Sequence, residues 1–169
     1  MKIGVLSDTH DRVEITTEAI RLLTEQGAET LLHCGDIETP DIVRLFKGID
    51  SHFVFGNWDG RVSSLLDAMS EVGATHHNDH GHLNLAGKEI AWVHSHRRGQ
   101  LRDLEQSGKF DFLFYGHTHV AESHRTGKTL VANPGALFRA KPRTCLLVDL
   151  ESGELRTIVV PVLDSGPRV

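Results

Sequence analysis

Five short apolar segments, each followed closely by polar residues of metal-binding type, constrain the fold of this chain more than any other feature. The segments span residues 2–6, 30–34, 51–55, 89–93 and 110–115. The groups after them are, in order, Asp8-Thr9-His10, Gly35-Asp36, Gly56-Asn57-Trp58-Asp59, His94 and Gly116-His117-Thr118-His119. Open α/β sheets bind ligands outside the carboxyl ends of their strands. This arrangement therefore predicts a metal centre along one edge of a sheet.

The order of the predicted elements indicates an α/β fold. Strands at residues 2–6, 30–34 and 51–55 alternate with helical patterns at residues 12–26, from Thr39-Pro40 onward, and at 62–72. A βαβαβ order predicts parallel strands with right-handed crossovers. The last third of the chain consists mostly of strands joined by short turns, which predicts antiparallel hairpins. Together these patterns predict a four-layer αββα sandwich of two mixed β-sheets flanked by helices.

The chain has 169 residues, which predicts one domain over residues 1–160 and a loosely ordered C-terminal tail at 161–169. No apolar stretch reaches the roughly 18–20 residues that span a bilayer, and no signal-peptide cleavage site follows the first strand. Cys34 and Cys145 have no CxxC partner, which argues against a zinc–thiolate site and fits a reducing compartment. We therefore expect a cytoplasmic protein without membrane contact. The net charge of −5 argues against a general nucleic-acid surface.

The candidate ligands are too many for one tetrahedral zinc ion. They are Asp8, His10, Asp36, Asn57, His94, His117 and His119. Nitrogen and oxygen ligands without thiolate suit two divalent ions that share a carboxylate, with Mn²⁺ as first choice and Zn²⁺, Fe or Ni²⁺ as alternatives. Two ions roughly 3.5–4 Å apart can hold a bridging hydroxide and clamp the oxygens of an in-line displacement. This chemistry predicts the hydrolysis of phosphoesters.

The five motifs in this order resemble those of the calcineurin-like metallophosphoesterases, and specifically of the small YfcE-like phosphodiesterases. The segment Asn133-Pro134-Gly135 also resembles one that these proteins carry near their final strands. The resemblance covers nearly the whole chain. It implies a phosphodiesterase rather than a monoesterase, with a metal-bridging hydroxide that attacks phosphorus in line.

The resemblance also implies a role for each candidate ligand. A first metal ion would be surrounded by Asp8, His10, Asp36 and His119. Asp36 would bridge to a second ion, which is completed by Asn57, His94 and His117. Asp36, Asn57 and His94 would form the catalytic centre, with Asn57 close to the phosphate. Asp59 would orient a ligand or its loop instead of binding metal.

Two positions depart from the pattern of the superfamily. Many members have a histidine directly after the motif asparagine, where it protonates the leaving group, but this chain has Trp58. YfcE-like proteins also lack that histidine. Trp58 therefore favours esters with good leaving groups, or protonation by water or by another histidine. The second departure is Ser95, which lies between His94 and His96 where the family usually has glycine, so that the backbone beside the metal could differ.

Several residues outside the ligand set are candidate substrate contacts. Trp58 could stack on a nucleobase, and His96 and Arg97 could contact phosphate or simply begin the next helix. We expect ordinary structural roles for His33, His52 and His124, and a solvated loop for the histidine-rich residues 76–82.

Two other functions are compatible with the sequence. One is a protein-binding module like the retromer scaffold subunit of the same fold, in which the metal motif has decayed; the intact histidines at 10, 94, 117 and 119 argue against it. The other is a dinuclear hydrolase of non-phosphate esters. For the preferred function we expect a small phosphoester or nucleotide as the substrate, and a homo-oligomer is compatible with it.

Overall fold

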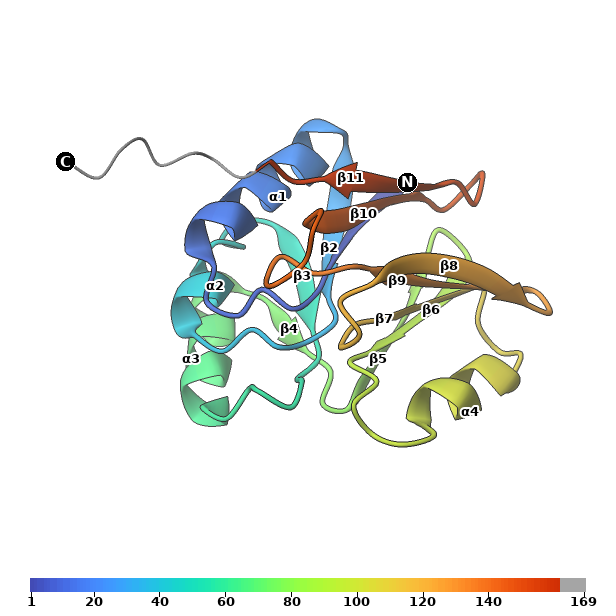
Figure 1. The fold of residues 1–169 in the computed structure, drawn as a ribbon, viewed down its shortest axis with the longest axis horizontal. Coiled ribbons are helices and arrows are strands. Elements are labelled where there is room, and N and C mark those ends of the chain that lie inside the picture. The colour runs from blue at the N-terminus through green and yellow to red at the C-terminus, as the bar shows by residue number, and fades with distance from the viewer. Residues whose placement is uncertain (162–169) are drawn as a thin grey trace.

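The computed structural model describes residues 1–161 as two β-sheets packed face to face with helices outside them (Figure 1). The first sheet has the order β11-β10-β1-β2-β3-β4. Its strands are β1 (Lys2–Leu6), β2 (Ala28–His33), β3 (Asp50–Phe53), β4 (Thr75–His76), β10 (Thr144–Asp149) and β11 (Leu155–Val159). The second sheet has the order β5-β6-β7-β9-β8. Its strands are β5 (His80–Leu85), β6 (Lys88–Val93), β7 (Phe112–Tyr115), β8 (Ala121–Thr126) and β9 (Thr129–Pro134).

Four helices complete the described chain: α1 (Val13–Glu25), α2 (Pro40–Arg44), α3 (Val62–Val72) and α4 (Gln100–Gln106). Helices α1 to α3 cover the outer face of the first sheet, and α4 covers part of the second (Figure 1). The predicted αββα sandwich of two mixed sheets is therefore confirmed. No helix within residues 1–161 is long and apolar enough to cross a membrane.

The pairing registers bring the ends of the strands to a common edge. In the first sheet β1, β2 and β3 are parallel, with Leu6 opposite His33 and His33 opposite Phe53. In the second sheet β6 and β7 are parallel, with Val93 opposite Tyr115. The loops that follow these five strands therefore start at matching levels. The predicted hairpins β8–β9 and β10–β11 are antiparallel, and β10 also pairs with β1, which makes the first sheet mixed.

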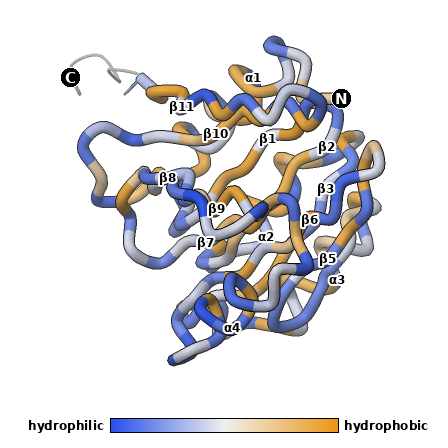
Figure 2. Tube along the Cα trace, turned by 90° about the vertical axis from the view of Figure 1, so that its right-hand side faces the viewer, coloured by the Kyte–Doolittle hydropathy of each residue, from blue (hydrophilic) through white to orange (hydrophobic). Residues whose placement is uncertain are grey.

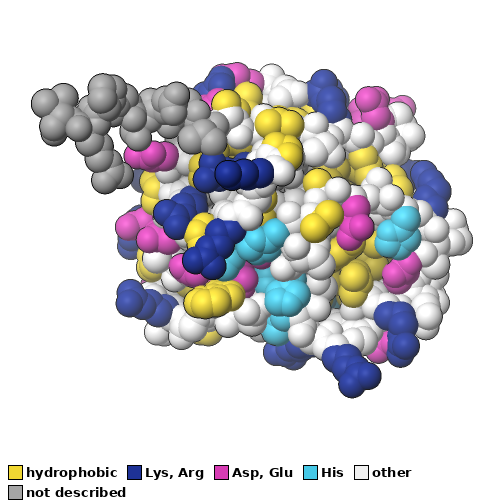
Figure 3. Space-filling view, in the orientation of Figure 1, with side chains coloured by type: hydrophobic (Ala, Val, Ile, Leu, Met, Phe, Trp, Pro, Cys, Tyr) yellow, Lys and Arg dark blue, Asp and Glu magenta, His cyan; other side chains and the backbone are white. Residues whose placement is uncertain are grey.

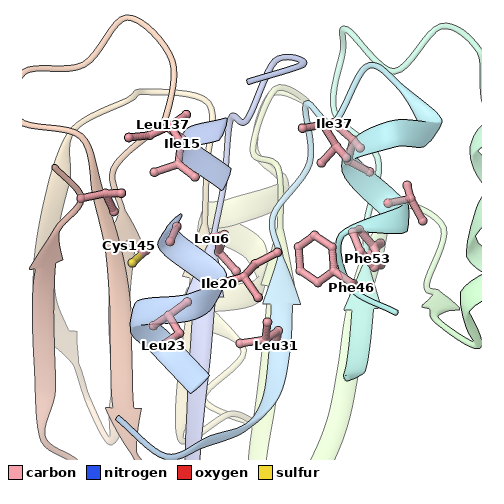
Figure 4. Close-up of a cluster of buried hydrophobic side chains, with 14 of the residues drawn as sticks. Leu6, Ile15, Ile20, Leu23, Leu31, Ile37, Phe46, Phe53, Leu137 and Cys145 are labelled. Atoms are coloured by element: carbon pink, nitrogen blue, oxygen red, sulfur yellow. The ribbon is translucent and has the colours of Figure 1, made fainter. Parts of the chain in front are cut away.

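The core consists of three apolar clusters that separate the layers. Side chains alternate along β1, so that Val5 points between the sheets and Leu6 toward the helices. The cluster under α1 to α3 contains Leu23, Phe46 and Phe53, among others (Figure 4). Figure 2 shows hydrophobic residues concentrated along the inner strands, whereas the turns are mainly hydrophilic. The buried faces of both sheets thus hold the strand ends in fixed positions relative to one another.

The prediction of a solvated loop at residues 76–82 is wrong in part: Asn78, Asp79, His80 and His82 are exposed, but both ends of the segment belong to strands. Residues Thr75–His76 form β4 beside β3, and β5 already begins at His80. His77 packs on Trp92, with ring centroids 4.7 Å apart, and its Nε2 lies 2.9 Å from Nδ1 of His52. Burial lowers the pKa of His77 to about 4. His77 is thus packed at the edge of the first sheet. A two-residue strand such as β4 is too short to show a periodic pattern in the sequence.

The predictions for Thr39 and His124 differ from the structure only in detail. Thr39 precedes α2 as expected, but its hydroxyl donates to Asp11 Oδ1 and makes no capping bond to the helix. His124 lies on β8, and its Nε2 is 2.8 Å from Glu105 Oε1. The division into a domain at residues 1–160 and a tail stays a prediction, because residues 162–169 lie outside the described part of the chain.

Candidate metal centre

The loops after β1 and β2 are joined by backbone hydrogen bonds, which hold their candidate ligands together. Asp8 N–H donates to the Gly35 carbonyl at 3.0 Å, and His10 N–H donates to the Asp36 carbonyl at 3.1 Å. Most of the candidate ligands have left-handed backbone conformations, with φ of 53° at Asp8, 43° at His10, 59° at Asp36, 72° at His117 and 61° at His119. Such conformations cost a non-glycine residue about 1–2 kcal/mol each, so their concentration here marks a functional site.

One group of candidate ligands is centred on Asp8, which is fully buried. Its Oδ1 lies 3.1 Å from Nε2 of His119 and 3.9 Å from Nε2 of His10. Its Oδ2 accepts hydrogen bonds from the Ser7 hydroxyl at 2.5 Å and from His117 N–H at 3.0 Å. One carboxylate oxygen is therefore held by the protein, and the other faces two imidazole nitrogens.

Asp36 lies between histidines from different sheets. Its Oδ2 is 3.4 Å from Nε2 of His10 and 3.3 Å from Nε2 of His94. Its Oδ1 accepts a hydrogen bond from Trp58 N–H at 2.9 Å. The second oxygen thus faces imidazole nitrogens of residues that follow strands of both sheets.

His94 connects the second sheet to this arrangement. Its Nδ1 donates to the Cys34 carbonyl at 2.8 Å, so Nε2 is the nitrogen that faces the centre. That Nε2 lies 3.1 Å from Asn57 Oδ1. The ring of His117 is 5.1 Å from the ring of His94. The structure therefore brings Asn57 and His117 close to His94, which itself lies beside Asp36.

The chemistry of these groups fits divalent cations. Within the described residues, Asp8 Oδ1 and His10 Nε2 are buried and have no hydrogen-bond partner. Burial raises the pKa of Asp8, but the neighbouring His119, His94 and Ser7 outweigh this effect and hold the pKa below its usual value. Burial also raises the pKa of Asp36. The hydrogen bond and charge interaction with His94 oppose this effect, and the pKa of Asp36 is lowered. Buried, ionised carboxylates beside unpartnered imidazole nitrogens match the ligand preference of borderline divalent metals.

Asp59 is buried and accepts four backbone hydrogen bonds, so both its oxygens are occupied by the protein. Its Oδ1 accepts from Ile37 N–H at 2.7 Å and Glu38 N–H at 2.8 Å. Its Oδ2 accepts from Asp36 N–H at 2.9 Å and Gly56 N–H at 2.7 Å. Asp59 thus fixes the left-handed turn that carries Asp36.

Glu38 contacts a candidate ligand and was not among the site residues predicted from the sequence. Its Oε1 lies 2.7 Å from Nδ1 of His10. A carboxylate on the second ring nitrogen orients a metal-binding histidine and directs Nε2 toward the ion. The signal in the sequence is weak, because Glu38 is one of several acidic residues near the ligands. Its contact with His10 depends on the left-handed conformations at Asp36 and Glu38.

The candidate substrate contacts do not all face the centre. Trp58 has 64% of its surface exposed, and its ring lies 6.0 Å from that of His10. The ring of His96 lies 5.4 Å from that of His94. Arg97, in contrast, pairs with Asp79 at 2.5 Å and lines a cavity of about 860 Å³ beside α4, in whose lining none of the candidate ligands occurs.

Ser95 adopts φ 73°, in the left-handed region that glycine adopts without strain. Its hydroxyl donates to the Gly116 carbonyl at 3.2 Å, which ties the end of β6 to the end of β7. On the face of the molecule drawn in Figure 3, histidine side chains lie near the middle, with basic, acidic and hydrophobic side chains beside them.

Residues 1–153 match the calcineurin-like phosphoesterase superfamily domain. This chain belongs to that superfamily. The resemblance inferred from the strand-end motifs is therefore confirmed, and the protein is a hydrolase that acts on phosphoesters. Calcineurin-like phosphoesterases use divalent metals, in agreement with the two groups of metal-binding side chains around Asp8.

Several relatives of this calcineurin-like protein are known. Phosphodiesterase MJ0936 of Methanocaldococcus jannaschii is 28% identical over 165 residues, which are 95% of this chain and 99% of the relative. A solved archaeal phosphodiesterase is 28% identical with a TM-score of 0.88, over 94% of this chain and 99% of that one. YfcE of E. coli shares the fold, with 18% identity and a TM-score of 0.69 over 95% of this chain and all of YfcE. Vps29 of Cryptosporidium parvum shares it too, with 18% identity and a TM-score of 0.67 over 93% and 95% of the two chains.

Proposed function

We propose that this protein is a dinuclear metal-dependent phosphodiesterase. The observation that carries the proposal is the position of Asp36 Oδ2, within 3.4 Å of Nε2 of His10 and within 3.3 Å of Nε2 of His94. A carboxylate oxygen near histidines that follow strands of both sheets can bridge two ions, and seven candidate ligands exceed what one tetrahedral ion needs. The relatives described as phosphodiesterases support the same reaction class.

The ligands divide into two sets around Asp36. Asp8, His10, Asp36 and His119 would hold the first ion, and Asp36, Asn57, His94 and His117 the second. When bound, two such ions activate water as the nucleophile and stabilise charge on the phosphoryl oxygens during in-line displacement. We propose Mn²⁺ as the first choice, with Zn²⁺, Fe or Ni²⁺ as alternatives, because mixed nitrogen and oxygen sites accept several ions.

The protein's own groups position the substrate. Asn57 Oδ1 lies 3.1 Å from Nε2 of His94 beside Asp36, and the side-chain N–H groups of Asn57 can donate to a phosphoryl oxygen there. The exposed indole of Trp58 offers an aromatic face but no proton of suitable pKa for a leaving alkoxide. We therefore propose diesters with good leaving groups as substrates, with water or another histidine such as His96 as the proton donor. Small phosphoesters or nucleotides in the cytoplasm are the substrates that we expect.

Hydrolysis of bis-p-nitrophenyl phosphate and p-nitrophenyl phosphate in the presence of Mn²⁺ tests the reaction class. We expect faster hydrolysis of the diester, and about two ions per chain by metal analysis. Asp36→Asn should bind fewer ions and lose at least about 100-fold in rate, because an amide cannot bridge as a carboxylate does. Asp67→Asn, at an exposed position of α3, is the matched control and should keep both properties.

Three outcomes contradict the proposal. A fully active Asp36→Asn protein excludes the bridged centre. A wild-type protein that holds no ions after metal-replete purification and leaves every phosphoester intact supports a binding module of the same fold instead. Cleavage of carboxylic esters alone would indicate a non-phosphate hydrolase.

A further inference from the structure

We propose that Arg12, Phe138 and Arg139 form a subsite beside the metal centre for a second phosphate group of the substrate. The inference rests on the proposed phosphodiesterase function and specifies its substrate class. We call these three residues the Phe138 subsite. None of them belongs to the candidate ligand set, and all three follow directly from loops that build the centre.

The loop after β9 is attached to the loop that carries Asp8. The backbone N–H groups of Leu137 and Phe138 donate to the Asp8 carbonyl at 3.3 and 3.1 Å. The Leu137 side chain is fully buried in the cluster under the helices, close to Ile15 (Figure 4). The next side chain, that of Phe138, packs on the imidazole of His10, with ring centroids 4.6 Å apart. The Phe138 ring is therefore held firmly at the border of the metal centre.

Two guanidinium groups lie over this ring. The Cζ atoms of Arg12 and Arg139 are each 4.8 Å from the ring centroid of Phe138. Arg12 immediately precedes α1, and Arg139 has a left-handed φ of 50°. Stacking on an aromatic ring orients a guanidinium while its N–H groups at the edges remain available for hydrogen bonds. Both guanidinium groups thus contact the ring that packs on His10.

Neither arginine is neutralised within the described part of the protein. Among residues 1–161, no carboxylate lies within 4.0 Å of Arg12 or Arg139, whereas Arg21 and Arg44 each pair with acidic side chains. Two positive groups beside one ring repel each other, and an anion bound near them reduces this repulsion. Guanidinium groups bind phosphate in a bidentate manner, which makes a phosphate the ligand that this pair fits best.

We assign this phosphate to a group other than the one that is cleaved. The reacting phosphoryl group would lie near Asp36, which faces Nε2 of His10, whereas the two guanidinium groups lie over Phe138, whose ring packs on the His10 imidazole. The Phe138 subsite therefore suits a second phosphate on the same molecule. Trp58 is the other aromatic residue whose ring lies near His10, at 6.0 Å, and a base can stack on its exposed face. The substrate class is thus a nucleotide diester that carries a further phosphate.

Two matched substrates test this inference. They are the p-nitrophenyl ester of thymidine 5′-phosphate and the same ester with an additional 3′-phosphate, which share the base, the scissile bond and the leaving group. With Mn²⁺ present, we expect kcat/KM to be at least about tenfold higher for the 3′-phosphorylated ester, mainly through a lower KM. In Arg12→Gln and Arg139→Gln this preference should fall several-fold, and in the double variant to about one. Arg102→Gln, an exposed position on α4, is the control and should keep the preference.

A binding measurement separates this inference from the proposed function. Titration calorimetry with thymidine 3′,5′-bisphosphate and thymidine 5′-phosphate, in Mn²⁺, needs no turnover. We expect at least about tenfold tighter binding of the bisphosphate, with the difference lost in the double variant. Equal binding of the two nucleotides, or a preference that survives in the double variant, overturns the subsite. If binding follows the expectation but no diester is cleaved, the proposed function fails and the Phe138 subsite stands.

Discussion

Substitution of Asp59 by asparagine is the sharpest test of how the centre is held in place. The carboxylate accepts four backbone N–H bonds, two on each oxygen. An asparagine has one acceptor oxygen and one NH₂ group, which is a donor. In either orientation of the amide, two of the four buried N–H groups lose their acceptor and face another donor.

The structure sets the magnitude of this effect. Each buried donor without a partner costs about 1–3 kcal/mol, so two of them reduce the free energy of unfolding by about 2–6 kcal/mol. The lower part of this range is favoured because burial also raises the pKa of Asp59, and the neutral amide avoids the cost of burying a charge. The displaced turn carries Asp36 and Glu38, so we expect metal affinity to fall by about 10–100-fold as well.

Two measurements check this prediction. Urea unfolding in EDTA, followed by circular dichroism, gives the stability without metal, and calorimetric titration with Mn²⁺ gives the affinity. Asp67→Asn, an exposed change of the same kind on α3, should alter neither. If Asp59→Asn costs less than about 0.5 kcal/mol and binds Mn²⁺ like the wild type, the four bonds do not hold the site and the reasoning is refuted.

Three further predictions concern neighbouring residues. Glu38→Gln replaces the charged acceptor of the hydrogen bond from His10 Nδ1 by a neutral one, so calorimetry should find about tenfold lower Mn²⁺ affinity. Unchanged affinity would contradict this role. In Gly56→Ala a Cβ would lie 2.1 Å from Asp36 Oδ1, so metal analysis should detect a lost ion and diester hydrolysis should fall by about 100-fold. Burial lowers the pKa of fully buried His33 to about 3, so below pH 6.5 only the unfolded chain gains this proton. The free energy of unfolding in EDTA should then fall by about 1.4 kcal/mol per pH unit from pH 6.5 toward pH 4.5. In His33→Gln it should fall less steeply by that amount.

The fold was predictable because most of its strands are long enough to show a pattern. The βαβαβ order required parallel pairing, and the registers of β1, β2 and β3 agree with it. Strand β4 has two residues and owes its existence to pairing with β3, which no local pattern encodes. The place of β10 beside β1 was equally hidden, because these strands are far apart in the sequence and either sheet could have accepted an apolar strand.

The candidate ligands were predictable because they directly follow strands, and strand ends in register must meet. The groups that orient them were not. Glu38 reaches His10 through left-handed conformations at Asp36 and Glu38, and Phe138 reaches it through the hydrogen bonds of its loop to the Asp8 carbonyl. Both contacts depend on backbone conformations that non-glycine residues adopt only when surrounding structure compensates the strain.

The centre combines ligands from two sheets, and protein contacts alone align them. The Cys34 carbonyl at the end of β2 fixes the ring of His94 at the end of β6, and Asp8 after β1 accepts the N–H of His117 after β7. Both bonds join protein groups, so they orient His94 and His117 through contacts other than bonds to an ion. What an ion adds is charge, because Asp8 and Asp36 are buried and ionised beside histidines that are neutral when they act as ligands. Metal binding should therefore stabilise an arrangement that contacts between the two sheets also favour.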